Sequence, residues 1–304
     1  MNWYTYAANN PLRFVDPTGL AAVIMAHGLN SGAMNEWEEM AAYLGDTKDF
    51  RIGGVINSGE EFVNNENRGL FTSIEWDRIQ NELKGEGVCK KTYMQTMIQA
   101  KVAELDEQDI DVLFMMNFSN NQGDFREQGA ELKKGIDLVN PDGMKANVVA
   151  HSMGSLATAS YIAGISGVEY SNDIDKFIAI GAPFSGSSGS NIVDKTGGWP
   201  LPRAKGPAYS NLRPGSEAIN ELQTTWNKNF GSQNKPFGVD FYSLQSMIGD
   251  GVVSWSSSTS LSGSLNIDMP FAFHTKQTKN INYQRQTYDI LRNTWTIDSF
   301  ITEY

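Results

Sequence analysis

Lys145-Ala-Asn-Val-Val-Ala-His-Ser-Met-Gly-Ser-Leu-Ala157 is the stretch on which the interpretation of this 304-residue chain depends. Residues 147–150 form a short apolar run typical of a buried parallel strand, and residues 155–163 are rich in small and apolar helix formers. Between them, Ala150-His-Ser-Met-Gly154 matches the Gly-x-Ser-x-Gly pattern, with Ala in the first position. The stretch therefore predicts a strand, a sharp turn and a helix, with Ser152 as a nucleophile at the helix N-terminus.

The composition suits one large α/β domain, because 40% of the residues are hydrophobic and 19% are charged. The formal net charge of −11 argues against a nucleic-acid partner and against charge-driven binding to anionic bilayers. The single cysteine, Cys89, excludes an intrachain disulfide and a cysteine-based zinc site. We expect neither a transmembrane helix nor a Sec signal, since no apolar run is long enough for the first and the N-terminus lacks a basic region and a long apolar region.

A second part of the site is predicted after the apolar strand 21–26, which ends in His27-Gly28-Leu29. A glycine here lets the backbone approach a substrate oxygen closely. We assign the backbone N–H groups of Leu29 and Met153 as the two donors of an oxyanion hole, with His27 and Gly28 in the loop that positions the first. The alternative is an ordinary glycine turn that closes a strand.

The triad acid is predicted just past a late strand, residues 239–247, where Asp250 lies between two glycines. Asp240 lies at the wrong end of this strand, Asp175 precedes its own strand, and Asp268 follows no predicted strand. Asp250 could also be an ordinary turn aspartate, but its place in the chain favours the acid role.

The base is identified by elimination among the three histidines. His27 ends the first strand, and His151 points away from the hydroxyl of Ser152 because neighbouring strand residues alternate. His274 alone follows Asp250 in the chain. The order Ser152, Asp250, His274 is that of the α/β-hydrolases.

The remaining pattern predicts an α/β fold: a doubly wound, mostly parallel sheet with helices on both faces and a loop or lid insertion. The polar stretch 58–93 is expected to be an insertion over the site, and the irregular segment 185–210 a lid. The other expected strands are 52–57, 111–118 and 175–180, and the expected helices are 36–44, 93–105, 124–139, 216–226 and 280–300.

The Ser152 turn, the His27-Gly28 loop, the Gly-Asp250-Gly turn and His274 together resemble the serine lipases and esterases, near the bacterial triacylglycerol lipases and the GPI-inositol-deacylase-like branch. The resemblance spans most of residues 21–304. It implies an α/β-hydrolase that cleaves acyl esters of membrane lipids, as a phospholipase does. It implies no metal and no cofactor.

The first 20 residues resemble something different. Tyr6-Ala-Ala-Asn-Asn-Pro11 followed by Asp16-Pro-Thr-Gly-Leu20 resembles the end of the Rhs-repeat core, a β-cage that encloses a C-terminal toxin. The resemblance implies cleavage after Leu20, with Asp16 contributing, and two parts: 1–20 as a core remnant and 21–304 as a lipase-like toxin domain. It further implies the Rhs core cage and a cognate immunity protein as partners. Delivery into a target cell by a type VI or related secretion system is expected, with action at a membrane, on the periplasmic or inner-membrane face.

Two alternatives stay open on the sequence alone. The chain could be a hydrolase-fold binding module with an inactive site, or a serine hydrolase that acts on a non-lipid ester, a thioester or an amide. The complete set of Ser152, Asp250 and His274 argues against the first, and pocket shape would decide the second.

Overall fold

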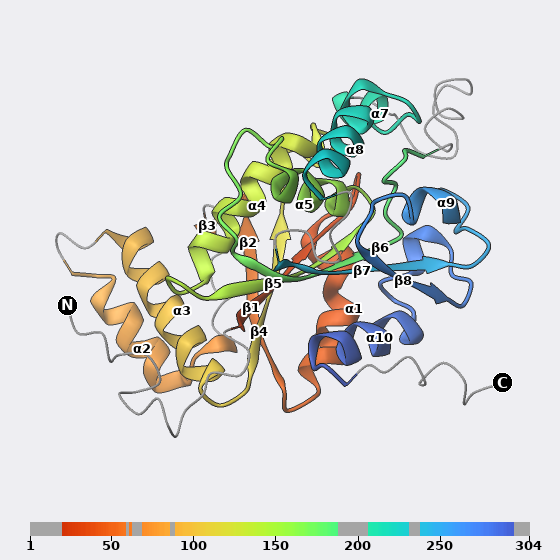
Figure 1. Cartoon of the computed structure of the whole chain (residues 1–304). Helices are drawn as coiled ribbons and strands as arrows, with labels where there is room; N and C mark the ends of the chain where they lie inside the picture. The colour runs from red at the N-terminus through yellow and green to blue at the C-terminus, as the bar shows by residue number, and fades with distance from the viewer. Residues whose placement is uncertain are drawn as a thin grey trace.

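A twisted eight-stranded sheet forms the centre of the molecule (Figure 1). The computed structural model describes residues 20–58, 61–62, 69–85, 89–187, 206–230 and 238–294. The strand order is β3-β2-β4-β1-β5-β6-β7-β8, and all neighbours are parallel except β2 and β3. The strands are β1 (Leu20–Ala26), β2 (Phe50–Asn57), β3 (Glu61–Phe62), β4 (Asp111–Asn117), β5 (Lys145–His151), β6 (Ile174–Ile180), β7 (Asp240–Ser246) and β8 (Ser264–Met269).

Helices cover both faces of this sheet, as the sequence predicts. Figure 1 shows α1 and α10 together on one side, and α4, α5 and α8 on the other. The helices are α1 (Ala33–Gly45), α2 (Ser73–Glu82), α3 (Lys90–Asp106), α4 (Phe125–Val139), α5 (Met153–Ala163), α7 (Pro207–Asn211), α8 (Glu217–Phe230), α9 (Trp255–Ser258) and α10 (Ile281–Leu291). Within the described ranges, none of the helices is long and apolar enough to cross a membrane.

The core divides into two layers because neighbouring strand residues point to opposite faces. In β1, Val23 and Met25 pack with Trp37 and Met40 of α1, whereas Ile24 joins the larger layer under α3, α4, α5 and α8. All of these side chains are fully buried. A parallel strand buried on both faces is apolar throughout, and this explains why the sequence of β1 is a continuous apolar run.

The strand order places a topological switch beside β1. From β1 the chain runs out to β2 and β3 and then returns to place β4 next to β1. It then crosses to the other side of β1, where β5 to β8 follow in order. In open α/β sheets the crevice at the carboxyl ends of the strands, where the order reverses, is the usual ligand site. The loops after β1 and β5, which carry Gly28 and Ser152, both lie at this point.

Two local features differ from what the sequence pattern indicates. Asp268 lies inside β8, a strand that the sequence pattern does not predict. On this edge strand Leu265, Asn266 and Asp268 are exposed and Ile267 and Met269 are buried, so the apolar pattern is too short to be recognised. In the described part of 58–93, which the sequence predicts to be an insertion over the site, Trp76 and Ile79 of α2 join the core layer that also contains residues of α3 and α4.

Several predictions fall on residues outside the described ranges. The proposed lid, 185–210, is described only at its two ends, the second of which enters α7. Residues 1–19 of the segment that resembles the end of the Rhs core, Asp16 among them, lie outside the described ranges as well. Leu20, the last residue of that segment, pairs with Lys145 of β5 in the sheet. The last predicted helix is α10, which ends at Leu291 rather than near residue 300.

Candidate active site

Ser152 occupies a tight turn between β5 and α5. Its backbone has φ 53° and ψ −123°, a combination that costs a residue with a side chain about 1–3 kcal/mol. The turn is held to the next strand by the N–H of Ser152, which donates to the carbonyl of Ile180 at 2.9 Å. Because α5 begins at Met153, the serine hydroxyl lies at a helix N-terminus, where backbone N–H groups are free to bind an anion.

The small residue two positions after Ser152 is required by backbone contact. A Cβ atom on Gly154 would lie 2.5 Å from the carbonyl oxygen of Ala26 and 2.7 Å from that of His27. Both neighbours are main-chain atoms of the β1 end, which cannot move aside as a flexible side chain can. The glycine of the motif therefore allows α5 to pack directly against β1.

The structure brings Ser152, His274 and Asp250 together, although up to 122 residues separate them in sequence. His274 Nε2 lies 2.7 Å from Ser152 Oγ, and His274 Nδ1 lies 2.7 Å from Asp250 Oδ2. Asp250 follows β7, and His274 begins a short 3-10 helix, His274–Lys276, after β8. All three side chains are buried.

Asp250 is held as an ionised acceptor. Its Oδ1 accepts from the N–H groups of Val252 and Val253 at 2.9 and 2.7 Å, and Gln277 Nε2 donates to Oδ2 at 3.2 Å. Burial raises the pKa of Asp250, but the hydrogen bond and charge of His274 and the two backbone N–H groups outweigh it, so the pKa lies below its usual value. The carboxylate therefore accepts a hydrogen bond from the Nδ1–H of His274 and fixes the tautomer of the imidazole.

His274 is set up to accept a proton at Nε2. Burial lowers its pKa and Asp250 opposes this, and the net pKa is below the ordinary value. A neutral imidazole whose Nδ1–H donates to Asp250 has its Nε2 lone pair directed at the hydroxyl of Ser152. This arrangement can remove the hydroxyl proton as the serine attacks an electrophilic carbon.

The loop after β1 lies directly against the nucleophile. A Cβ atom on Gly28 would lie 2.8 Å from the Cβ of Ser152. The carbonyl of Gly28 accepts from His27 Nδ1 at 2.8 Å and from the N–H of Ser31 at 3.4 Å. In a trans peptide the N–H points opposite to the carbonyl, so the N–H of Leu29 is directed away from both donors. Its role with Met153 as an oxyanion donor stays a prediction.

His27 supports this loop and does not take part in the triad. Its Nε2 accepts from the N–H of Phe118 at 3.3 Å, and its ring packs edge-on against the Phe118 ring. Burial lowers the pKa of His27, which keeps it neutral. The residue thus connects the ends of β1 and β4 and fixes the Gly28 carbonyl.

Sequence reasoning missed two polar residues near the triad. Gln277, which contacts Asp250, shows no sequence signal that distinguishes it from other loop residues. Glu36 does show one, because it lies four and eight positions before the buried Met40 and Leu44 of α1. A carboxylate on the apolar stripe of a helix indicates a buried partner, which here is His151.

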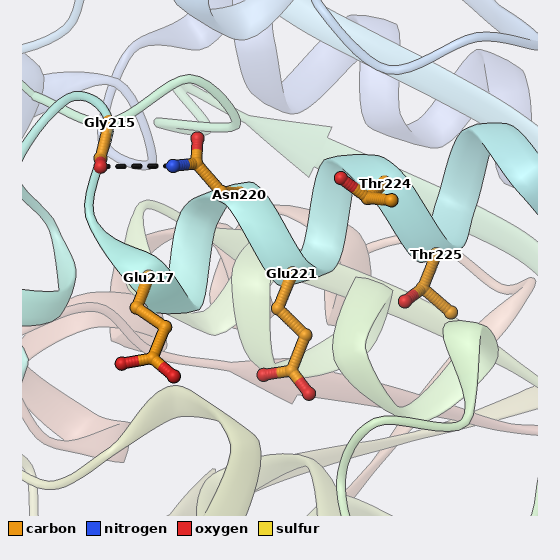
Figure 2. A pocket seen from close by; sticks show the side chains of 6 residues that line it. All are labelled: Gly215, Glu217, Asn220, Glu221, Thr224 and Thr225. Atoms are coloured by element: carbon orange, nitrogen blue, oxygen red, sulfur yellow. Dashed lines mark hydrogen bonds between the residues drawn. The ribbon is translucent and has the colours of Figure 1, made fainter.

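A hollow on the outer side of α8 does not contain any of the predicted site residues. Figure 2 shows its polar lining, in which Asn220 Nδ2 donates to the carbonyl of Gly215 at 3.0 Å. The lining residues are Gly215, Glu217, Asn220, Glu221, Thr224 and Thr225. Carboxylates and hydroxyls in an open hollow do not suit an acyl chain. No group of His, Cys, Asp and Glu side chains in the described ranges could hold a metal ion.

Comparisons with known proteins agree with this fold. A family model described as lecithin:cholesterol acyltransferase matches residues 120–196, a segment that contains the Ser152 turn. No curated protein matches the chain. The lin2722 gene product of Listeria innocua is 15% identical with a TM-score of 0.51, over 91% of this chain and 96% of that one. The mature lipase BlEst2 of Bacillus licheniformis is 15% identical with a TM-score of 0.54, over 94% of this chain and 96% of that one. At this identity the likeness shows the fold, which is that of the lipase-like α/β-hydrolases.

Proposed function

We propose that the chain is a serine hydrolase that cleaves acyl esters of membrane lipids, as a phospholipase does. The observation that carries the proposal is the hydrogen-bonded series from Ser152 Oγ through His274 to Asp250, at a strained turn on the carboxyl edge of a parallel sheet. A strained residue with φ above zero is retained where the surrounding structure enforces it, and such residues cluster at active sites.

The reaction follows from the positions of these groups. Ser152 Oγ attacks the ester carbonyl while His274 Nε2 takes its proton, and the N–H groups of Leu29 and Met153 bind the oxyanion. His274 then gives the proton to the leaving alcohol, and an acyl-enzyme ester remains on Ser152. A water molecule, deprotonated by His274, releases the fatty acid and restores the hydroxyl. Each oxyanion donor is worth about 3 kcal/mol of barrier.

A lipid substrate is supported by apolar side chains beside the acid and the base. In the part of the chain that the structure describes, half of the exposed large apolar side chains lie in the two segments that carry Asp250 and His274. Ile248 is 82% exposed and Phe273 64%. The members of this apolar rim are Met247, Ile248, Trp255, Phe271 and Phe273.

The apolar rim is also nearly free of charge. Between residues 247 and 275 the only charged side chains are Asp250, which is buried in the site, and Asp268, which accepts from Trp255 Nε1 at 2.8 Å. The nearest basic residue along the chain is Lys276, which ends the short 3-10 helix that His274 begins. Exposed aromatic and aliphatic residues with so few charges among them suit insertion into an uncharged or zwitterionic lipid surface. An anionic surface is disfavoured by the net charge of −11.

The biological setting is proposed on the sequence resemblance of residues 1–20 to the end of an Rhs core. On this proposal the hydrolase is the toxin domain of an Rhs effector, enclosed by the core cage before delivery through a type VI or related secretion system. It acts at a membrane of the target cell, on its periplasmic or inner-membrane face, and the producing cell makes an immunity protein against it. Growth arrest on export to the periplasm, with loss of the effect in Ser152→Ala, is the expected result.

The test of the enzymatic proposal has two parts. Fluorophosphonate labelling detects a serine activated by a base, and hydrolysis of phosphatidylcholine vesicles reports the lipid ester. Ser155→Ala is the matched control, because the hydroxyl of Ser155, three positions after Ser152, only donates to the carbonyl of Ala150 at 2.9 Å. We expect labelling and fatty-acid release in the wild type and in Ser155→Ala, and neither in Ser152→Ala.

The outcomes separate the alternatives. A folded wild type that is not labelled would show a binding module and refute the proposal. Labelling without release of acyl chains from phospholipid or triglyceride would refute the lipid substrate and favour a non-lipid ester, thioester or amide. Accumulation of lysophospholipid in treated cells would identify the bond that is cut.

A further inference from the structure

A second carboxylate–imidazole pair lies next to His274, and the reaction described above does not use it. His151 immediately precedes Ser152 and is almost fully buried. Its Nδ1 lies 2.7 Å from Glu36 Oε1, in an ion pair whose carboxylate side chain is only 11% exposed. Its Nε2 lies 3.0 Å from the backbone carbonyl oxygen of His274.

The two contacts of His151 define its protonation state. A carboxylate oxygen lies close to Nδ1, in an ion pair rather than an aligned hydrogen bond, and a carbonyl oxygen lies close to Nε2. Both oxygens are acceptors, so these contacts stabilise the ring that carries a hydrogen on each nitrogen, which is a cation. The pKa values agree: burial lowers the pKa of His151, but the charge of Glu36 raises it above the ordinary value. Burial raises the pKa of Glu36, but His151 lowers it, to about 2.

This pair is joined to the loop of the base in three ways. The Nε2–H of His151 donates to the main chain of His274, and the two imidazole rings lie 4.6 Å apart between centroids. Thr278 Oγ1, four residues further along, donates to Glu36 Oε1 at 3.4 Å. Helix α1 thus supports, through Glu36 and His151, the turn that presents His274 to Ser152.

We propose that Glu36 and His151 form a buried ion pair that positions His274 and places a fixed positive charge beside its ring. The proposal rests on the proposed function, because it assigns the pair to the base of that reaction. Glu36 and His151 are positioning residues here, since neither touches the reacting atoms.

The fixed charge has a consequence for the pH dependence. The charged or titratable groups that face His151 are Glu36 on α1, Asp250 after β7, His274 after β8 and the neutral His27 at the end of β1. The cation of His151 disfavours a second positive charge on His274, and Glu36 partly offsets it. Loss of the cation therefore raises the pKa of His274, and the pH at which the rate falls on the acid side moves upward.

The test compares Glu36→Gln, His151→Gln and the double variant. Glu36→Gln keeps the size of the side chain and removes the charge that holds His151 protonated. We expect each single variant to lower kcat about 10- to 100-fold, the range for a catalytic group displaced by about 1 Å, with KM unchanged. The acid limb of the pH–rate profile moves to higher pH. The double variant loses no more than His151→Gln, because the two residues act as one unit.

Glu39→Gln is the matched control. Glu39 lies on the same helix and its Oε1 is 3.1 Å from Lys279 Nζ, in the segment that follows His274, but this ion pair is at the surface. We expect kcat and the pH profile of Glu39→Gln to equal those of the wild type. Singles that match this control, or losses that multiply in the double variant, would overturn the proposal.

A measurement on the wild type covers the case in which a variant does not fold. Nitrogen NMR of the histidine rings at pH 7 reports how many ring nitrogens carry a hydrogen. We expect His151 to carry two and His274 one, and a neutral His151 at pH 7 would overturn the proposal. This result is independent of catalysis: an unlabelled Ser152 would defeat the proposed function and leave the protonation of His151 as measured.

Discussion

Gly28→Ala tests how closely the loop after β1 must approach the nucleophile. The new methyl carbon would lie 2.8 Å from Ser152 Cβ, whereas non-bonded carbons prefer about 3.5–4.0 Å. The loop and Ser152 must therefore separate by about 0.7 Å or more. The new methyl group has little room to turn away from Ser152, because His151 Nδ1 and the His151 carbonyl oxygen both lie 3.4 Å from its position.

The expected loss follows from this displacement. A catalytic site tolerates errors of about 0.5 Å, and a displacement of about 1 Å costs up to about 100-fold in rate. A separation of about 0.7 Å thus predicts a fall in kcat of about 10- to 100-fold, or about 1.4–2.7 kcal/mol of barrier. KM should change little, because the oxyanion forms only in the transition state.

The assay is steady-state hydrolysis of a soluble p-nitrophenyl ester, with thermal unfolding measured in parallel. Gly32→Ala, in the same loop, is the control, because its methyl carbon would meet only Asn117 Oδ1 at an ordinary 3.4 Å. We expect Gly32→Ala to keep the kcat of the wild type. If folded Gly28→Ala also keeps it, the loop does not supply an oxyanion donor, and the assignment of Leu29 is refuted.

Three further predictions concern the charges of the site. Asp250→Asn should lower kcat about 10⁴-fold with little change in the melting temperature, because the imidazole loses the acceptor that fixes its tautomer; a loss below tenfold would contradict the acid role. The pKa of His274 lies below 6.5, so kcat/KM should be constant near neutral pH and fall only as the pH drops through a midpoint below 6.5. A midpoint above 6.5 in the pH–rate profile would contradict the lowered pKa of His274. The pKa of Glu36 is lowered to about 2, so its ion pair contributes stability above pH 4.5 that is lost as the pH falls through 2. Urea unfolding should show Glu36→Gln less stable than the wild type at pH 6, by on the order of 3 kcal/mol, with the gap closing toward pH 2, whereas a constant gap would contradict the pKa.

The Ser152 turn was the most predictable part of the molecule. Its pattern is dictated by main-chain contacts, since Gly154 must admit the carbonyls of Ala26 and His27. Asp250 and His274 were predictable because parallel strands present their following loops at the same sheet edge, so chain order alone selects the candidates. The distances between the three residues required the folded structure.

Residues with weak or distant signals were not predictable. Edge strand β8 buries only one face, and its short pattern of Ile267 and Met269 does not distinguish it from a loop. The partner of Glu36 lies 115 positions away, at the end of β5, and no local period connects the two. Sequence periodicity shows that a charge lies on a buried stripe, but the packing of α1 against the sheet determines which group neutralises it.

Two carboxylates, those of Asp250 and Glu36, lie near the base His274, but only the charge of Asp250 is left unbalanced. Asp250 is negative and contacts the ring directly, whereas the negative charge of Glu36 is balanced by His151. Without that balance, both carboxylates would favour the protonated form of His274 and weaken the base at neutral pH. With it, the pKa of His274 stays low while the main chain of the residue is held by a charged donor. The ion pair therefore fixes the position of the base without adding a net charge to its surroundings, which an isolated buried glutamate or histidine could not do.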